Sequence, residues 1–575
     1  MNSYPIVLKY SLIILSLFAL YCSILIGFSW DEYFHHINGL VRYNFLISLG
    51  EFEKYNFRNN QFYPGLYDTL SYAFGQIFYF FDKRFYVENL DKLMHFFNAT
   101  FALLGVLGLF IFTKKIFNKN IAYISAFLTL LNPFFFGHIG MNSKDIIIFF
   151  SLIWFCNYFY SYCVDENKKI KNIILASVFV GFGCGVRLTF LITILPCVII
   201  GLVFLIQKYR SNYLNLFKRL IAHILISLLI VVFLIIICWP HMIVEIKNDN
   251  FINFFSIIVK NTINWNDGPK IGLINGSYYE VFNTPKTYFI DIILYRYPIY
   301  ASLLLVTSYF LFFTKRLNSS LIIENFNQKF LGVNIIGFFS IFIAIILGVN
   351  IYDNLRLFLF TIPFISLISS FALEYLFKTF YTSKKIKLYS LVLLFLFSLS
   401  LYRFISLTPY QYAYVNYSSP VFKNTIGKWE HDYWGASYKE LVQKIKNTFL
   451  QEDIENFKIA DCGGGDWTLI YYLKKELGVK RTYSSNKDLD QATHIVMNNR
   501  VFLDVFDNDY VKNLVNEKGE MLLSDMEEVV RAPNIKQKCF EYKKFDGINV
   551  VEVNRSGVPM TDLRKLKNYI IVICI

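Results

Sequence analysis

Long apolar runs separated by short clusters of charge restrict what this chain can fold into. The first run, residues 10–28, reads YSLIILSLFALYCSILIGF and contains no charged residue. About 20 consecutive apolar residues cross the hydrocarbon core of a bilayer as one helix. Only 17% of the 575 residues are charged, whereas soluble domains carry about 25%. The sequence therefore predicts a multi-pass α-helical membrane protein.

Eleven spans are predicted, and the charge between them predicts their orientation. The spans are residues 9–28, 93–113, 120–137, 145–163, 172–186, 188–206, 220–239, 290–313, 331–349, 357–377 and 388–407. Short connections rich in Lys and Arg are typical of cytoplasmic loops. Here they are residues 114–119, 168–171, 208–219, 315–329 and 378–387. Alternation then puts the N-terminus in the cytoplasm and the C-terminus outside the cell membrane. The net charge of +14 lies largely in these clusters, so we expect no nucleic-acid partner.

The composition changes to that of a soluble domain at about residue 408. KWEHDYWGASYKELVQKIKNTF has the pattern of an amphipathic helix, and FKIADCGGGDWTLIYYLKKELG reads as a strand, a glycine turn and a helix. THIVMNN and GINVVEV read as further strands, and YIIVICI as a strand or tail. We expect residues 1–407 to form the transmembrane domain and residues 408–575 a small α/β domain on the outer side. The aromatic HDYW is compatible with stacking on a sugar or with docking the domain onto the membrane, and a disulfide among Cys462, Cys539 and Cys574 is left open.

Ionisable residues gather at the outer ends of the predicted spans. Such residues are costly at membrane depth and by default mark functional sites. The set consists of Asp31, Glu32 and His35 after the first span, His138, Lys144 and Asp145 in the second outer turn, and Arg187, His241 and Arg356 at later outer ends. Cations suit an anionic ligand and a carboxylate suits proton transfer. Their common position predicts one site that combines both.

Taken one at a time, these residues have simpler explanations. Asp31 and Glu32 are equally compatible with a solvated helix end, and His35 with a surface residue. Asp145 suits the N-terminus of any helix because the helix dipole favours negative charge there. Arg356 is compatible with an anchor to lipid headgroups. Only the joint placement favours a functional site.

The ordered motifs resemble those of the GT-C glycosyltransferases, in particular the protein O-mannosyltransferase and aminoarabinose-transferase superfamily. That family opens its first outer loop with Asp-Glu and a nearby His, which are Asp31, Glu32 and His35 here. MNSKDIIIFF resembles the family's Asn-Pro-Lys-Asp stretch, with Ser143 in place of proline. YDNLRLFLFTIPF resembles its Tyr-Asp-x-x-Arg-His segment, with Leu357 in place of His. TPYQYAYVNY and DYWGASYKE resemble the stretch after the last span in a bacterial subgroup.

The resemblance implies transfer of a sugar from a polyprenyl-phosphate donor to an acceptor hydroxyl at the extracytoplasmic face of a bacterial inner membrane. It implies that Asp31 is the general base of an inverting displacement and that Glu32 orients the acceptor or shares the proton. The candidates for the donor phosphate are Lys144, Arg187, His241 and Arg356, and those for other substrate contacts are His35, Asp145 and His138. The acceptor is left open between protein, lipid and glycan.

No cofactor is expected. A divalent metal is compatible with the chemistry, but the WWD signature of the metal-dependent oligosaccharyltransferases is absent from the sequence, so no metal is predicted.

A second function class is a transporter or flippase of a lipid-linked or anionic solute. A transporter is expected to carry ionisable residues near the midplane of the membrane, often in repeated halves. This chain shows no internal repeat and carries its charges at one edge. A non-enzymatic scaffold leaves the clustered charges unexplained. The sequence therefore favours the glycosyltransferase.

Overall fold

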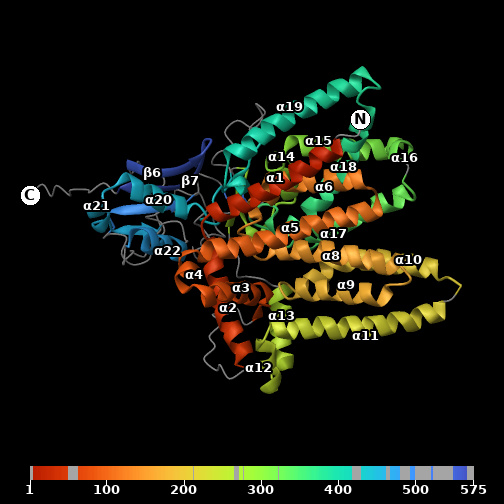
Figure 1. The fold of residues 1–575 in the computed structure, drawn as a ribbon, viewed down its shortest axis with the longest axis horizontal. Helices are drawn as coiled ribbons and strands as arrows, with labels where there is room; N and C mark the ends of the chain where they lie inside the picture. Colours follow the sequence, from red (N-terminus) through yellow and green to blue (C-terminus); the bar gives the residue numbers. More distant parts are fainter. Residues whose placement is uncertain are drawn as a thin grey trace, which may run out of the picture.

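The computed structural model describes residues 4–48, 62–211, 213–263, 271–275, 277–321, 323–416, 429–461, 466–478, 492–498, 520–521 and 548–565. Long helices form a bundle with their axes roughly side by side, and a small region with β-strands lies at one end of it (Figure 1). The glycine turn at 463–465, YIIVICI and the three C-terminal cysteines lie outside the described residues.

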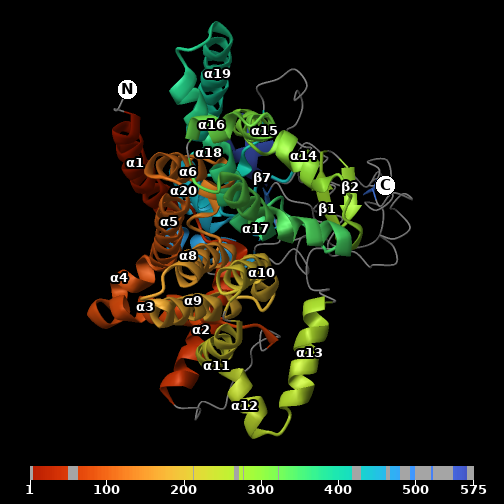
Figure 2. The same ribbon diagram turned by 90° about the vertical axis from the view of Figure 1, so that its right-hand side faces the viewer.

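Eight of the described helices are long and apolar enough to cross a membrane. They are α1 (Tyr4–Leu25), α5 (Leu90–Ile116), α8 (Asp145–Val164), α10 (Phe190–Lys208), α11 (Tyr213–Cys238), α17 (Phe326–Leu347), α18 (Ile362–Thr379) with the preceding η3 (Arg356–Thr361), and α19 (Lys384–Ser406). The view along the bundle shows α8 inside it and α11 and α19 at its periphery (Figure 2). The apolar side chains of α11 are accordingly exposed, as a lipid-facing helix requires.

The fold class of a multi-pass helical membrane protein is confirmed, and every predicted span coincides with a helix or helix pair. Two of them are shorter than a bilayer requires: α6 (Lys119–Leu130) has 12 residues and α9 (Lys169–Cys184) has 16. The span expected at 290–313 is broken into α14 (Tyr288–Tyr295) and α15 (Ile299–Phe313), which are bent by 116°. Pro298 precedes α15 and has no backbone N–H to continue a helix through the break. The count of eleven therefore stays a prediction.

Shorter elements connect these helices. They are α2 (Trp30–Ile47), α3 (Leu66–Phe81), α4 (Lys83–Glu88), α7 (Pro133–His138), α12 (His241–Lys247), α13 (Phe251–Ile263), β1 (Ile271–Ile274), β2 (Ser277–Glu280), η2 (Val281–Asn283), α16 (Arg316–Leu321) and η4 (Gln411–Ala413). Helices α2, α3 and α4 lie at the same end of the bundle as the C-terminal region, whereas α16 and the N-terminus lie at the opposite end (Figure 1). The connections predicted as outer and as cytoplasmic are thus separated in space.

The C-terminal region is a small α/β structure, as predicted. It contains α20 (Tyr438–Thr448), α21 (Gln451–Glu455), β3 (Ile459–Asp461), α22 (Asp466–Leu477), β4 (His494–Asn498), β5 (Glu520–Met521), β6 (Ile548–Arg555) and β7 (Val558–Lys565). Four strands form a sheet in the order β3-β4-β7-β6, in which only β3 and β4 are parallel. The strands predicted from THIVMNN and GINVVEV are β4 and β6. Strand β5 pairs instead with β2, next to β1.

Candidate active site

Three of the predicted residues meet at the N-terminus of α8. The carboxylate of Asp145 lies 2.7 Å from Nη1 of Arg187 and 3.3 Å from Nε of Arg356. Asn142 donates from its amide to the same carboxylate at 3.0 Å and accepts the backbone N–H of Asp145. Asp145 is buried, and a buried carboxylate is stable only when it is paired and hydrogen-bonded. We call Asp145, Asn142, Arg187 and Arg356 the Asp145 cluster.

Arg356 is also held by aromatic rings. Its guanidinium carbon lies 4.4 Å from the ring centre of Trp434 and 5.3 Å from that of Tyr352. The other arginine of the cluster, Arg187, keeps part of its side chain exposed. The Asp145 cluster therefore presents two fixed guanidinium groups whose orientation is set by one carboxylate and by stacking.

Lys144 and Asp31 interact electrostatically with each other and with arginines of the Asp145 cluster. Burial lowers the pKa of Lys144, and the charges of Arg187 and Arg356 act in the same direction, against the opposing effect of the Asp31 carboxylate. Asp31 interacts electrostatically with Arg356 as well. The Asp31 side chain is partly buried in the first turn of α2. It makes no hydrogen bond or ion pair with any residue that the structure describes, so its carboxylate is available to accept a proton.

Glu32 has a different environment from its neighbour. One of its carboxylate oxygens accepts the backbone N–H of Ser29 at 2.6 Å and lies 3.0 Å from Nε2 of His95. The other oxygen is buried without a partner among the described residues. These contacts suit Glu32 for holding the N-terminus of α2, and therefore the backbone that carries Asp31.

His35 belongs to a buried ion network that the sequence did not indicate. Its Nδ1 lies 2.8 Å from one carboxylate oxygen of Asp68, and the other oxygen lies 2.6 Å from Nη1 of Arg42. Burial alone would raise the pKa of Asp68, but His35, Arg42 and Lys144 together lower it. Arg42, in the second half of α2, and Asp68, in α3, are each the only charge in their stretch of sequence. An isolated charge of this kind is the signal that could have identified them.

Two predicted histidines lie in different surroundings. His138 is buried beside Tyr412 and Trp434, and neither ring nitrogen has a hydrogen-bond partner in the described part of the chain. Burial and the charge of Arg356 lower the pKa of His138 to about 3. It is therefore a neutral group beside the Asp145 cluster. His241 instead pairs with Glu245 at 3.0 Å and packs on Phe254.

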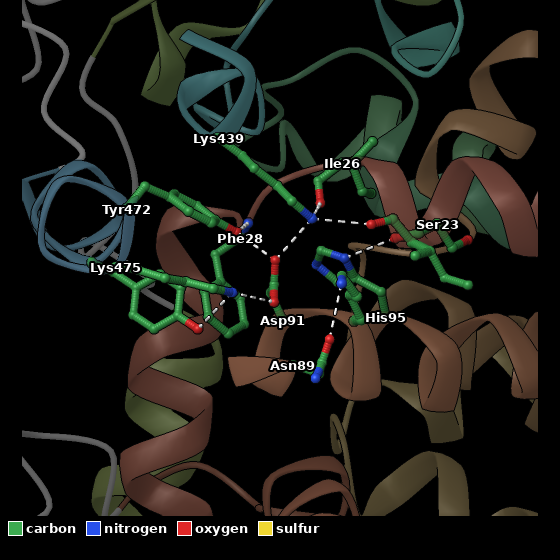
Figure 3. Close-up of polar contacts among 12 residues, drawn as sticks. Ser23, Ile26, Phe28, Asn89, Asp91, His95, Lys439, Tyr472 and Lys475 are labelled. Atoms are coloured by element: carbon green, nitrogen blue, oxygen red, sulfur yellow. Dashed lines mark hydrogen bonds and ion pairs between the residues drawn. The ribbon is translucent and has the colours of Figure 1, made fainter. Parts of the chain in front are cut away.

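A second buried carboxylate joins the bundle to the C-terminal region. Asp91, in the first turn of α5, lies 2.9 Å from Nζ of Lys439 and 3.2 Å from Nζ of Lys475, and it accepts the hydroxyl of Tyr472 at 3.0 Å (Figure 3). Lys439 also donates to the carbonyls of Ile24, in the last turn of α1, and of Ile26, just after it. We call Asp91, Lys439, Tyr472 and Lys475 the Asp91 junction. It lies one helical turn from His95, which contacts Glu32.

Within the described ranges, no three His, Cys, Asp or Glu side chains are grouped so as to hold a metal ion. The expectation of a metal-free site stays a prediction. The arrangement as it stands combines a carboxylate that can take a proton with three cations that can neutralise an anionic group.

Comparison with known proteins confirms the resemblance over part of the chain. Residues 86–239 match the family model of dolichyl-phosphate-mannose-protein mannosyltransferase. This segment contains His138, Lys144, Asp145 and Arg187 and covers less than half of the chain. No curated protein sequence matches the chain.

Solved structures give weaker similarity. The oligosaccharyltransferase AglB from Archaeoglobus fulgidus, in complex with an inhibitory peptide and a dolichol-phosphate, is 11% identical with a TM-score of 0.48, over 87% of this chain and 70% of that one. ArnT from Cupriavidus metallidurans bound to undecaprenyl phosphate is 12% identical with a TM-score of 0.47, over 87% of this chain and 94% of that one.

Proposed function

We propose that the protein is an integral-membrane glycosyltransferase that moves a sugar from a polyprenyl-phosphate donor to an acceptor hydroxyl. The observation that carries this proposal is that the carboxylate of Asp31, which has no ion pair among the described residues, lies close enough to the cations Lys144 and Arg356 to act on both electrostatically. The match of residues 86–239 to a mannosyltransferase family supports the same reaction class. A lipid-linked donor requires a site at the membrane boundary, and all three residues lie at helix ends.

The proposed reaction is a single displacement. The acceptor oxygen attacks the anomeric carbon while the bond between that carbon and the phosphate oxygen breaks, and the electron pair leaves with the phosphate. The proton of the acceptor hydroxyl passes to Asp31. Attack from the side opposite the leaving group inverts the anomeric centre. Because phosphate is stable as an anion, cations can replace a protonating acid, and one carboxylate suffices.

The other residues take supporting roles in this proposal. Lys144, Arg187 and Arg356 bind the donor phosphate, and Asp145 holds the two arginines in place. His138 offers the donor two ring nitrogens that have no hydrogen-bond partner among the described residues. Glu32 holds the turn that carries Asp31, and His35 holds the same helix against Asp68. His241 stays a candidate for the phosphate, although its observed contact is with Glu245.

We place this site on the extracytoplasmic face. The basic connection that contains α16 is predicted to be cytoplasmic, and α16 lies at the end of the bundle opposite to α2 (Figure 1). The C-terminal region, residues 408–575, would then be an extracytoplasmic domain.

The proposal is tested with purified protein in lipid vesicles and polyprenyl-phosphate donors labelled in the sugar, both hexose and pentose. Protein, lipid and glycan acceptors are supplied in separate reactions. We expect that one of the donors will give both labelled acceptor and sugar-free polyprenyl phosphate in the same reaction. Intact donor that crosses the vesicle membrane without loss of its sugar would instead support the transporter.

Replacing Arg187 by Gln is expected to weaken use of the donor. A hydrogen bond from a charged group contributes roughly 1.5–3 kcal/mol, so kcat/KM for the donor should fall by about 10- to 150-fold. Asp145 keeps Arg356 and Asn142 as partners in this variant. Arg84→Gln is the matched control, because Arg84 is exposed on α4 and pairs only with Glu88 among described residues. Equal activity of the two variants would remove Arg187 from the phosphate site.

The activity is expected to fall at alkaline pH because Lys144 loses its proton. The pKa of Lys144 is lowered by burial, Arg187 and Arg356, while Asp31 and Asp68 oppose the change. A lysine with a lowered pKa becomes neutral at a lower pH than an ordinary lysine, and donor binding should weaken there. Lys144→Arg should move this alkaline decline to higher pH, because arginine keeps its charge. A pH profile of kcat/KM that is identical for both proteins would contradict the assignment.

A further inference from the structure

Trp434 contacts both halves of the proposed site. Its indole ring faces the guanidinium of Arg356, at 4.4 Å from the ring centre to the guanidinium carbon. Its backbone carbonyl accepts the N–H of Trp30 at 3.2 Å, and Trp30 directly precedes Asp31. One residue of the segment after the last membrane helix therefore touches the helix that carries the proposed base and the arginine proposed to bind phosphate.

The turn around Trp434 is held firmly by its neighbours. The carboxylate of Asp432 accepts hydrogen bonds from the hydroxyls of Tyr412 and Ser437, both at 2.6 Å, and from the backbone N–H of Ala436 at 3.2 Å. Gly435 has a φ of +65°, a conformation that side chains disfavour. The N–H of Gly27 donates to the carbonyl of Ala436 at 2.9 Å, and a Cβ on Gly27 would lie only 2.8 Å from that oxygen. Trp434 is thus fixed against the α1–α2 turn.

The polar edge of Trp434 has no hydrogen-bond partner among the residues that the structure describes. The side chain is 3% exposed, and its indole nitrogen makes no hydrogen bond within the described part of the chain. A buried donor without an acceptor is unfavourable, and native structures usually satisfy such a group with a ligand, water or ion. The indole N–H only donates, so it fits an oxygen atom. The ring centre of His138 lies 6.4 Å from that of Trp434, and both of its nitrogens also lack a hydrogen-bond partner in the described ranges.

We propose that Trp434 is a positioning residue of the transfer reaction, whose ring orients Arg356 and whose indole N–H donates to a phosphate oxygen of the polyprenyl-phosphate donor. This inference rests on the proposed function. Asp145 holds Nε of Arg356, and the ring of Trp434 covers one face of the guanidinium. A carboxylate oxygen of Asp353 lies 3.7 Å from Nη1 of Arg356, beyond hydrogen-bond distance. The N–H groups of Nη1 and Nη2 then lie in a fixed plane, which suits the bidentate binding of phosphate by arginine.

The two parts of this role can be separated by substitution. Trp434→Phe keeps an aromatic face but loses the N–H, and a lost hydrogen bond to a charged group corresponds to about tenfold weaker binding or more. Trp434→Leu loses the ring as well, which should weaken binding by a further factor of about 3 to 10 through the cation–π contact. The difference between Phe and Leu therefore measures the action of the ring on Arg356.

The experiment measures binding of a polyprenyl phosphate without sugar to the purified full chain in detergent. Wild type, Trp434→Phe and Trp434→Leu are compared alone and in the Arg356→Gln background. We expect the Phe–Leu difference to disappear, to within about twofold, when Arg356 is absent. Trp467→Leu is the control, because Trp467 is 42% exposed and stacks on Tyr33. It should bind as wild type does.

Three outcomes would overturn the inference. Binding by Trp434→Phe that equals wild type excludes the N–H donor. A Phe–Leu difference that persists without Arg356 shows that the ring acts through general packing. Wild-type protein that binds no polyprenyl phosphate overturns the proposed function, which the first two outcomes leave intact. If Trp434→Leu does not fold, Trp434→Phe still tests the hydrogen bond, and Trp434→Met replaces Leu as the variant without a ring.

Discussion

Replacing Asp31 by Asn is expected to reduce sugar transfer by about 10²- to 10⁴-fold, the contribution of a positioned general base. Asparagine has nearly the same shape as aspartate but accepts no proton at neutral pH. Asp31 makes no ion pair or hydrogen bond in the described part of the chain, so its removal should leave the fold intact. The measurement is the rate of labelled product formation in vesicles, beside the binding of polyprenyl phosphate and the thermal unfolding midpoint of each protein.

Glu32→Gln separates the roles of the two adjacent carboxylates. Glu32 is buried and contacts Ser29 and His95, so this variant should lower the unfolding midpoint as well as the rate. Asp31→Asn should change the rate alone. Transfer by Asp31→Asn within about threefold of wild type, well short of the loss expected for a general base, would mean that another group takes the proton.

Replacing Asp91 by Asn is expected to lower the free energy of unfolding by about 3–5 kcal/mol, the usual cost of breaking a buried ion pair on one side. Asp91 is fully buried, and its partners Lys439 and Lys475 are 8% and 21% exposed. The substitution leaves both ammonium groups without their counter-charge at the contact between α5 and the C-terminal region. The free energy of unfolding is measured from denaturant titration in detergent.

Glu88→Gln is the matched control for this prediction. Glu88 pairs with Arg84 on α4, and both side chains are largely exposed. An exposed pair contributes at most about 1 kcal/mol, so the control should barely change the unfolding free energy. If Asp91→Asn is as stable as Glu88→Gln, the Asp91 junction does not hold the C-terminal region to the bundle. Lys439→Met would then also be expected to have little effect.

The transmembrane helices follow from the sequence because their signal is local. Transfer of a run of apolar side chains into lipid is favourable wherever the run occurs, so α1, α5 and α8 appear where the runs are. The break between α14 and α15 is different. The span predicted at 290–313 continues through Pro298, and only the structure shows a bend of 116° there. Helices α6 and α9 overlap predicted spans but are too short to cross a bilayer by themselves.

The candidate site could be predicted only as a list of residues at one face. Charge at membrane depth is costly, so charges at one set of predicted span ends made Lys144, Asp145, Arg187 and Arg356 candidates without any structure. Which charge pairs with which was not predictable. Asp145 and Arg356 are separated by 211 residues in sequence, and local composition carries no information on such a contact.

Some partners carried no usable signal at all. His95 lies within the apolar span predicted at 93–113, and Asp91 lies just before the start of that span. Both nevertheless form buried polar contacts. Trp434 belongs to a stretch that the sequence left open between sugar stacking and membrane docking. In the structure it is buried against Arg356 instead. Aromatic composition cannot distinguish these roles, because the same ring suits all three.

The sequence by itself determined the membrane class, the small C-terminal α/β region and the face on which polar residues gather. These follow from the solvation of each residue, which depends on the residue and its near neighbours. Only the tertiary structure decided that Asp31 has no ion pair or hydrogen bond among the described residues whereas Glu32 is held by Ser29 and His95, and that Asp145 joins two arginines. Ion pairing and burial depend on chain segments brought together by packing, and the free energy of a charge changes by several kcal/mol with its partners.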